Sequence, residues 1–401
     1  MSALLPLAEA LERVLAAAVP TIGVETRRLL DAAGLVLASD ITSTLDVPPA
    51  DNSAMDGYAL RAADAPGPLA ISQRIPAGAV PEPLSAGTAA RIFTGASVPP
   101  GADAVVMQEN CAEADGHVTV TGAVGEGENI RRRGQDIASG ETALRRGRRL
   151  RPQDMGLLAS LGLAEVPVYR PLRVAVLATG DELVEPGAAL AHDNQIYNSN
   201  RYTLAGLLRG LDLELVDCGI VPDDPESTAN ALTDAAARAD CVITSGGVSV
   251  GEEDHVKAQV EKLGRLDLWK LAIKPGKPLA FGRVADTPFI GLPGNPSSVF
   301  VTFCLVARPF LLRLQGIDDI EPPRLSARAD FEVRRPGKRQ DYLRVTVRND
   351  GKELVAQRFP NQSSGVLSSV SHSNALAVVP PGTCVAVGDA VEVLLLDLLT
   401  S

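Results

Sequence analysis

The strongest constraint on the fold is a regular alternation of short apolar runs and amphipathic segments over residues 172–321. Apolar runs of this length predict buried strands, and the amphipathic segments predict helices that pack on them. The expected strands are residues 174–177, 214–216, 241–244, 268–273, 278–281 and 288–290, and the expected helices are residues 200–211, 226–239, 254–263 and 296–314. This alternation predicts a mostly parallel, doubly wound α/β sheet, whose ligands bind at the C-terminal ends of the strands.

The rhythm of the sequence differs on both sides of this segment, and 401 residues are too many for one hydrophobic core. Residues 39–144 alternate short apolar runs with Pro, Gly, Asp and Asn, which predicts a turn-rich β module. Further helices are expected at residues 6–18, 25–33 and 152–161, and further strands at residues 166–169, 343–347, 353–356, 375–379 and 391–396. We therefore expect a small discontinuous helical domain (residues 1–38 and 145–171), an inserted β-rich domain (39–144), the α/β domain (172–321) and a C-terminal β-barrel-like domain (322–401).

Composition argues against several classes of function. The formal net charge of −11 disfavours a general nucleic-acid-binding or anionic-membrane surface, although the arginine-rich residues 131–133 and 145–151 could form a local anion site or a solvated surface. The five cysteines and four histidines are scattered without CxxC spacing, which argues against structural zinc and iron–sulfur sites. The N-terminus has no basic region before an apolar run, and no apolar stretch looks long enough to span a bilayer, so we expect a cytoplasmic protein.

The first candidate site residues follow the first strand of the α/β segment. Gly180 and Glu182 belong to the sequence Thr-Gly-Asp-Glu at residues 179–182. Carboxylates at a strand end can bind Mg²⁺, which prefers a few hard oxygens together with phosphate and water. The same acidic residues are also a common signal for the start of a helix.

A glycine-rich loop follows the expected strand at residues 241–244, and it contains Ser245, Gly246, Gly247, Ser249 and Gly251. Glycines let the backbone approach a phosphate, and successive N–H groups at the start of a helix form an anion nest. The loop matches neither Walker A nor GxGxxG, and a plain tight turn is the alternative. Asp254, directly after the loop, could bring a metal ion to the same phosphate.

A third loop is cationic. Lys274 and Lys277 are separated only by Pro and Gly, and such a stiff loop predicts a site for phosphate or another oxyanion. The loop that contains Pro293 and Asn295 then opens the long helix, with Asn295 as its expected N-cap and Pro296 as its first residue.

Three polar clusters of the inserted module lie beside expected strands. They are residues 51–59 with Asp56, residues 91–96 with Thr94, and residues 130–136 with Asp136. Asp and Asn at such places often cap turns, and that structural role is the alternative to a binding role.

Together these motifs resemble the MoeA family of molybdopterin molybdenumtransferases, which is related to the E domain of gephyrin. The matching segments occur in the family's order and cover most of the chain: PPADNSAMDGYA (48–59), RIFTGASVP (91–99), GADAVVMQE (101–109), IRRRGQDI (130–137), TGDEL (179–183), SGGVSVGEED (245–254), WKLAIKPGKPLAFG (269–282) and GLPGNPSS (291–298). The resemblance implies an enzyme of molybdenum cofactor biosynthesis that inserts molybdate into adenylylated molybdopterin and releases AMP.

The resemblance also implies an elongated homodimer whose α/β domain is of the molybdopterin-binding type. The site would lie at the dimer interface, where Asp56 and Thr94 of one chain would face Glu182 and Asp254 of the other. A molybdopterin adenylyltransferase, and proteins that accept or carry the finished cofactor, would be the further partners.

Individual roles follow from the same resemblance. Glu182 and Asp254 would hold Mg²⁺ near the pyrophosphate, and the loop at residues 245–251 would cradle phosphate. The positions that would collect molybdate are Lys274, Lys277, Ser298 and Arg344. The other acidic site positions are Asp56, Asp136 and either Asp223 or Asp224, and a further site serine would lie within residues 363–373. Gln135 stands where the family commonly has a glutamate, so a role that depends on charge there does not carry over.

Two other functions remain open from the sequence. A molybdopterin adenylyltransferase would share the α/β domain, but the inserted and C-terminal domains favour the molybdenum-inserting enzyme. A non-catalytic scaffold is the other alternative, because the E domain of gephyrin clusters receptors; this chain shows no disordered linker or fused adenylylating domain.

Overall fold

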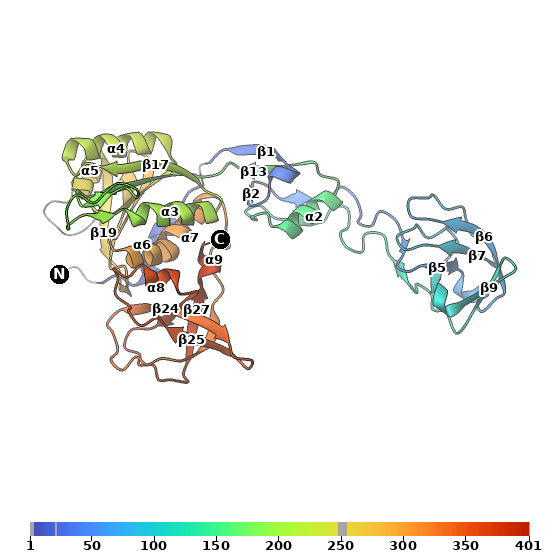
Figure 1. Cartoon of the computed structure of the whole chain (residues 1–401). Helices are drawn as coiled ribbons and strands as arrows, with labels where there is room; N and C mark the ends of the chain where they lie inside the picture. The colour runs from blue at the N-terminus through green and yellow to red at the C-terminus, as the bar shows by residue number, and fades with distance from the viewer. Residues whose placement is uncertain (1–3, 21, 248–254, 401) are drawn as a thin grey trace.

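The computed structural model describes residues 4–20, 22–247 and 255–400, and within them the chain is elongated. Figure 1 shows the α/β domain and the C-terminal β domain at one end, a distal β domain at the other, and a small linking domain between them. The predicted fold class is confirmed: a doubly wound α/β domain, an inserted β-rich domain, a small discontinuous domain and a C-terminal barrel.

The α/β domain is built on one six-stranded sheet. Its order is β17 (Glu214–Val221), β14 (Arg173–Thr179), β18 (Cys241–Ser245), β22 (Thr287–Leu292), β21 (Pro278–Val284) and β19 (Gly264–Lys270). The first four strands are parallel, β21 runs in the opposite direction, and β19, which pairs antiparallel with β21, again runs in the direction of the first four. The sheet is therefore mostly parallel, as the alternation of strands and helices predicts.

Both faces of this sheet are covered by helices. Alternate residues of β14 point to opposite faces, so Val174 and Val176 join one core while Ala175 and Leu177 join another. The first face carries α1 (Leu7–Ala16), α3 (Ser199–Gly210), α6 (Pro296–Thr302) and α7 (Arg308–Leu314). The second face carries α4 (Pro225–Arg238) and α5 (His255–Leu263).

The most apolar helix of the protein is part of this core. The helical run Pro296–Leu314 has 19 residues and a mean hydropathy of 1.5, so by length and composition it could cross a membrane, contrary to the expectation from the sequence. However, 94% of it is buried inside the protein, where it packs between the sheet and the C-terminal domain. It is the only such helix among the described residues.

The linking domain contains fewer helices than predicted. It is a three-stranded antiparallel sheet of β1 (Val24–Arg28), β13 (Glu165–Tyr169) and β2 (Val36–Leu37), covered by α2 (Pro152–Ser160). The helix expected at residues 25–33 is wrong, because residues 24–28 pair with β13 and only Leu29–Asp31 form a short 3₁₀ turn. Pairing with a strand more than 130 residues away in the chain overrides the local periodicity.

The distal domain is a second six-stranded sheet. Its order is β8 (Ala104–Met107), β5 (Gly57–Leu60), β7 (Thr88–Ile92), β6 (Leu69–Ile75), β10 (His117–Val120) and β9 (Cys111–Ala114). Two short pairs lead to it: β3 (Ile41–Thr42) with β12 (Thr142–Leu144), and β4 (Asn52–Ser53) with β11 (Ile130–Arg131). The chain thus leaves and re-enters the linking domain along paired strands.

The C-terminal domain is a closed barrel. Its strands are β23 (Leu325–Ala329), β24 (Gln340–Asn349), β25 (Leu354–Arg358), β26 (Ala375–Val379) and β27 (Ala390–Leu395), and the pairing of β24 with β26 closes the ring. The short strand β20 (Ile273–Lys274) of the α/β domain pairs with β24. This pairing fixes the cationic loop of the α/β domain to the barrel.

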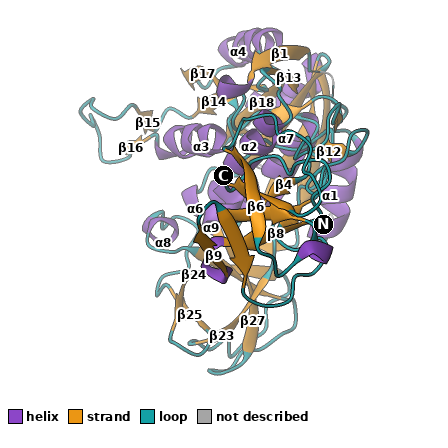
Figure 2. Cartoon of the chain, turned by 90° about the vertical axis from the view of Figure 1, so that its right-hand side faces the viewer, coloured by secondary structure: helices purple, strands orange, loops and turns teal. Residues whose placement is uncertain are grey.

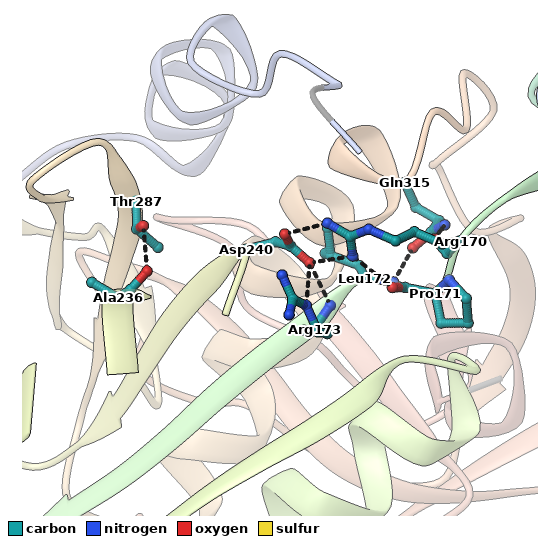
Figure 3. A network of polar contacts seen from close by, with 8 residues as sticks. All are labelled: Arg170, Pro171, Leu172, Arg173, Ala236, Asp240, Thr287 and Gln315. Carbon is teal, nitrogen blue, oxygen red and sulfur yellow. Dashed lines mark hydrogen bonds and ion pairs between the residues drawn. The ribbon is translucent and has the colours of Figure 1, made fainter. Parts of the chain in front are cut away.

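A carboxylate clamp secures the junction between the linking and α/β domains (Figure 3). Asp240, at the start of β18, accepts hydrogen bonds from both terminal nitrogens of Arg170, at 2.7 and 2.6 Å, and from the backbone N–H of Arg173 at 2.8 Å. Gln315 binds the same junction, because its side chain contacts the backbone of Arg170 and Leu172. The junction therefore sets the direction in which β14 enters the sheet.

Candidate functional site

A cleft of about 640 Å³ lies at the C-terminal edge of the α/β sheet and reaches the barrel. Four loops of the α/β domain form most of its wall, and the turn before α8 (Ser368–Ser371) forms the rest. The polar residues and loop glycines and prolines that line it include Thr179, Glu182, Tyr197, Asn198, Asn200, Ser245, Gly246, Lys274, Lys277, Pro293, Gly294, Asn295, Ser298, Arg339, Gln362, Ser363 and Ser364. The loops predicted from three separate strand ends thus meet in one place.

The strand order gives the cleft a direction. Along this edge of the sheet the loops after β14, β18 and β22 follow one another, and the loop that precedes β21 comes last. Three strand spacings separate the first loop from the last, which is about 14 Å. Glu182 therefore lies at one end of the cleft, the glycine loops lie in the middle, and Lys274 and Lys277 lie at the other end.

At the first end, Glu182 is exposed and does not begin a helix, so the helix-start interpretation of this motif is wrong. The chain instead turns into a projecting segment, residues 183–197, which we call the arm and which carries β15 (Leu183–Val184) and β16 (Ile196–Tyr197) (Figure 2). The N–H of Ile196 donates to the backbone carbonyl of Glu182 at 2.8 Å. Gly180 has a φ of +142°, a backbone conformation that favours glycine, and it lies directly beside the exposed Glu182 carboxylate.

In the middle of the cleft, Ser245 ends β18 and is 3% exposed. Its hydroxyl has no hydrogen-bond partner among the described residues, although Ser245 lines the cleft. Gly246 follows, and its N–H donates to the carbonyl of Leu292 at 3.1 Å, which holds the β18 and β22 loops together. Gly247 has a φ of +65°. The predicted site residues Ser249, Gly251 and Asp254 lie outside the described residues.

The neighbouring loop at residues 293–296 leads into α6 as predicted, with Asn295 preceding the helix and Pro296 as its first residue. However, the side chain of Asn295 makes no capping hydrogen bond; it is exposed and lines the cleft. The N–H of Ser297 donates to the carbonyl of Ser364 at 3.0 Å, so the start of α6 is joined to the barrel.

The cationic end contains both predicted lysines. Lys274 lies 3.5 Å from the carboxylate of Asp341, and its side chain remains 51% exposed, so the ion pair leaves it accessible to a ligand. Lys277 is also exposed and lines the cleft. Between them, Gly276 has a φ of +100° and packs so closely on α6 that a Cβ would overlap the hydroxyl of Thr302. Ser298, which is 4% exposed, completes this wall.

Arg344 does not line the cleft but lies behind it. It is 1% exposed, and its guanidinium donates to the hydroxyl of Ser369 and to the carbonyls of Tyr342 and Ser363. No carboxylate among the described residues pairs with it. Burial lowers the pKa of Arg344 to about 10, so the group stays protonated at neutral pH. A buried cation behind Ser363 makes the adjacent end of the cleft attractive to anions.

Four predicted acidic or polar positions do not reach this cleft within one chain. Asp56 and Thr94 lie in the distal domain, which the linking domain separates from the cleft (Figure 1). Asp136 is exposed near the strands that lead to the distal domain. Asp223 is exposed and has no hydrogen bond to a described residue, whereas Asp224 caps α4 by accepting from Glu226 and Ser227.

Most arginines of the two arginine-rich stretches form ion pairs within the protein. Arg132 and Arg133 bind Asp51 and Asp46, and Arg149 binds Asp212. Arg148 and Arg151 both bind the buried Asp154. These residues stabilise the linking region and do not form a free anion site.

Sequence reasoning missed several lining residues, above all Tyr197, Asn198 and Asn200 on the arm and at the start of α3. The polar run Asn-Ser-Asn directly before the predicted helix at residues 200–211 was the available signal, since Asn is a common N-cap. Asn198 does cap α3, by accepting from the N–H of Arg201 at 3.3 Å.

The described residues contain no group of three His, Cys, Asp or Glu side chains that could by itself hold a metal ion. Glu182 is the one carboxylate among the described residues that line the cleft. A single exposed carboxylate fits Mg²⁺, which often binds through one or two carboxylates while phosphate and water complete its shell.

Comparisons with known proteins agree along the whole chain. Residues 5–162 match the profile of the MoeA N-terminal region (domains I and II), residues 175–313 that of a probable molybdopterin-binding domain, and residues 326–396 that of the MoeA C-terminal region (domain IV). The chain is 43% identical over 361 residues to a molybdopterin molybdenumtransferase of Haemophilus influenzae, with 88% of this chain and 89% of that protein covered. It is 38% identical over 380 residues to one of a Nostoc species, with 91% and 87% covered.

A crystal structure of the molybdopterin biosynthesis MoeA protein of Pyrococcus horikoshii has the same fold. Its TM-score with this structure is 0.84 at 30% sequence identity, and the match covers 98% of this chain and 100% of that one. Three consecutive domain profiles, whole-length relatives and a whole-length structural match lead to one conclusion. The chain belongs to the MoeA family.

Proposed function

We propose that this protein inserts molybdate into adenylylated molybdopterin and releases AMP, as a step of molybdenum cofactor biosynthesis. The observation that carries the proposal is the single cleft in which an exposed carboxylate, glycine loops and a pair of lysines follow one another along the sheet edge. Relatives of similar length carry the name molybdopterin molybdenumtransferase, which supports the same reaction.

The cationic end of the cleft suits the oxyanion. Molybdate is a doubly charged tetrahedral anion, and Lys274 and Lys277 are exposed there as compact charges. Arg344 adds a charge that water screens poorly because it is buried. Ser298 and Ser363 line the same end and can donate hydrogen bonds to the oxygens of the anion.

The middle of the cleft suits the phosphates of the substrate. Gly246 and Gly294 bring the backbone to the surface without side chains, and the hydroxyl of Ser245, which has no partner among the described residues, lies in the same part of the cleft. These groups would orient the pyrophosphate so that the dithiolene reaches the lysine end.

Glu182 is the residue we propose to hold Mg²⁺, together with Asp254. When bound, Mg²⁺ would offset phosphate charge and make the phosphoanhydride easier to cleave. Within the chain itself, the arm fixes the backbone of Glu182 through the bond from Ile196, and Gly180 leaves room beside its carboxylate. Its exposed position at the edge of the phosphate region supports this role.

We further propose that the active unit is a homodimer. Within one chain the distal domain, with Asp56 and Thr94, is too far from the cleft to contribute to it (Figure 1). A second copy could place its distal domain and the strands that lead to it over the cleft, so that Asp56, Thr94 and Asp136 act beside Glu182 of the partner chain. Asp223 follows β17, the neighbour of β14 in the sheet, and would act from the same chain as Glu182. We expect the protein to act in the cytoplasm, after a molybdopterin adenylyltransferase and before a cofactor acceptor or carrier.

The test is a molybdate-dependent release of AMP from adenylylated molybdopterin by the purified protein. AMP that appears only when molybdate and Mg²⁺ are present is the expected result. Synthesis of the adenylate from ATP and free molybdopterin would identify an adenylyltransferase instead. Absence of both reactions would favour a scaffold.

A further inference from the structure

Two asparagines at the start of α3, between the arm and the central loops of the cleft, each have one amide atom without a partner among the described residues. Asn198 is 1% exposed; its side-chain oxygen caps α3, and its Nδ2 has no partner among the described residues. Asn200 donates its Nδ2 to the carbonyl of Gly294 at 2.7 Å, and its Oδ1 is buried without a described partner. The internal hydrogen bonds fix both amide orientations. The cleft wall therefore offers one donor and one acceptor at defined places.

An aromatic side chain on the residue before Asn198 lines the same cleft. Tyr197 ends β16 on the arm, lines the cleft and is 45% exposed. Its hydroxyl donates to the carbonyl of Ala188 at 3.0 Å, which ties the ring to the rest of the arm. Ile196, which is 55% exposed, and Leu183 add apolar surface at the same end. A ring face beside a free donor and a free acceptor suits a planar heteroaromatic ligand.

We propose that Tyr197, Asn198 and Asn200 bind the adenine ring of the substrate and set its base specificity. This inference rests on the proposed function for the identity of the ligand. Adenine carries an amino donor next to ring-nitrogen acceptors, which matches a free acceptor on Asn200 and a free donor on Asn198. Tyr197 supplies a stacking surface.

The direction of the cleft assigns adenine, and not the pterin, to this end. The dithiolene of molybdopterin lies between the pterin ring and the phosphate, and it must be near the molybdate at Lys274 and Lys277. The pyrophosphate then lies on the central loops after β18 and β22. Adenosine, on the far side of the pyrophosphate, extends toward the loop after β14 and the arm.

Equilibrium binding of nucleotides to the full-length protein tests the proposal, with AMP, IMP, GMP and ribose 5-phosphate as probes. Wild-type protein is expected to bind AMP more tightly than the other three. Tyr197→Ala should weaken AMP binding about tenfold, within the range of one lost base–aromatic stack, and leave ribose 5-phosphate unaffected. Tyr197→Phe keeps the ring and should retain most of the affinity. Tyr202→Ala changes an exposed tyrosine of α3 that does not line the cleft but whose hydroxyl donates to Glu185 on the arm, so it controls for a loosened arm and should leave AMP binding unchanged.

Asn198→Asp is the sharper variant, because aspartate keeps the oxygen that caps α3 but cannot donate to a ring nitrogen. It should weaken AMP binding and shift the preference toward IMP, whose ring carries an N–H at that edge. Equal binding of AMP and ribose 5-phosphate, or unchanged AMP binding by both Tyr197→Ala and Asn198→Asp, would overturn the proposal. Tighter binding of GMP than of AMP would also overturn the proposal, because guanine and the pterin carry the same pattern of amino and oxo groups, and the site would then suit the pterin.

The binding experiment and the AMP-release assay test the adenine subsite and the proposed reaction separately. If AMP binds with this specificity but no molybdate-dependent AMP release occurs, the proposed reaction fails and the adenine subsite stands. If AMP release proceeds while the variants bind nucleotides like the wild type, the adenine subsite fails alone.

Discussion

The carboxylate of Asp56 accepts two hydrogen bonds from Thr94, one from its backbone N–H at 2.7 Å and one from its hydroxyl at 2.8 Å. Both residues are exposed on the distal domain, and the contact joins the turn before β5 to the turn after β7. The pair holds two turns together and leaves the carboxylate exposed, where it could also contact another surface.

The hydrogen bonds from Thr94, first the backbone one and then the hydroxyl one, hold the pKa of Asp56 below its usual range. Thr94→Val keeps the backbone donor and removes the hydroxyl, so the pKa of Asp56 should rise toward the usual value. Because the ionised form is then lost at a higher pH, the acid limb of the AMP-release profile should move to higher pH. Carboxyl NMR titration measures the pKa directly, and an unchanged value would contradict this assignment of the shift.

Mixing two inactive variants tests whether the distal domain acts on the cleft of a second chain. Asp56→Asn and Lys274→Ala should each abolish AMP release while the fold is retained. Exchanged subunits would restore one intact site in each mixed dimer, so the mixture should recover up to about a quarter of the wild-type rate. A mixture of Glu182→Gln with Lys274→Ala should stay inactive, because both changes affect the same cleft. Failure of the first mixture to recover activity, despite proven subunit exchange, would exclude a shared site.

We expect the Asp240 clamp to stabilise the folded protein. The side chain of Asp240 is 16% exposed; burial raises its pKa, but hydrogen bonds from Arg170 and Arg173 lower it more, so the net pKa lies below the usual range. Asp240→Asn keeps the size but loses the charge, and should reduce the free energy of unfolding by about 2 kcal/mol at neutral pH.

The sign of the pH dependence follows from the lowered pKa of Asp240. The stabilisation is present above the pKa of the unfolded carboxyl and is lost as the pH falls through the depressed folded value. Urea unfolding at several pH values should therefore show a smaller difference between the variant and the wild type in acid. A constant difference at all pH values would rule out a charge-dependent clamp.

Much of the fold could be predicted because its signals are local. The strands of the α/β sheet and the barrel are marked by apolar runs, and a parallel sheet necessarily brings the ends of β14, β18 and β22 to one edge. The exception at residues 25–33 has a physical reason: its partner, β13, comes from the other half of a discontinuous domain. No local pattern carries that information.

The site was predictable only in part. Motifs at strand ends indicated Glu182, Ser245 and Lys274, and all three line the cleft. The depth of a side chain is not a local property, so the sequence did not show that Arg344 lies behind Ser363. The arm was missed because its residues are polar and irregular, and their place over the cleft depends on contacts such as that of Asn200 with Gly294.

The last prediction concerns the stiffness of the lysine loop. Gly276 has a φ of +100°, and a Cβ there would overlap the hydroxyl of Thr302 on α6. Gly276→Ala should cost about 1–3 kcal/mol in stability and move the loop away from the helix. Because Lys274 and Lys277 flank this glycine, the molybdate concentration for half-maximal AMP release should rise at least about tenfold, equivalent to about 1.4 kcal/mol.

Gly78→Ala is the matched control, since Gly78 also has a positive φ, +84°, but lies in the distal domain with no described heavy atom beyond its chain neighbours within 4 Å of the added Cβ. It should lose some stability through backbone strain alone and keep the wild-type dependence on molybdate. If Gly276→Ala also kept that dependence, the position of the lysines would not depend on the close packing of this loop against α6.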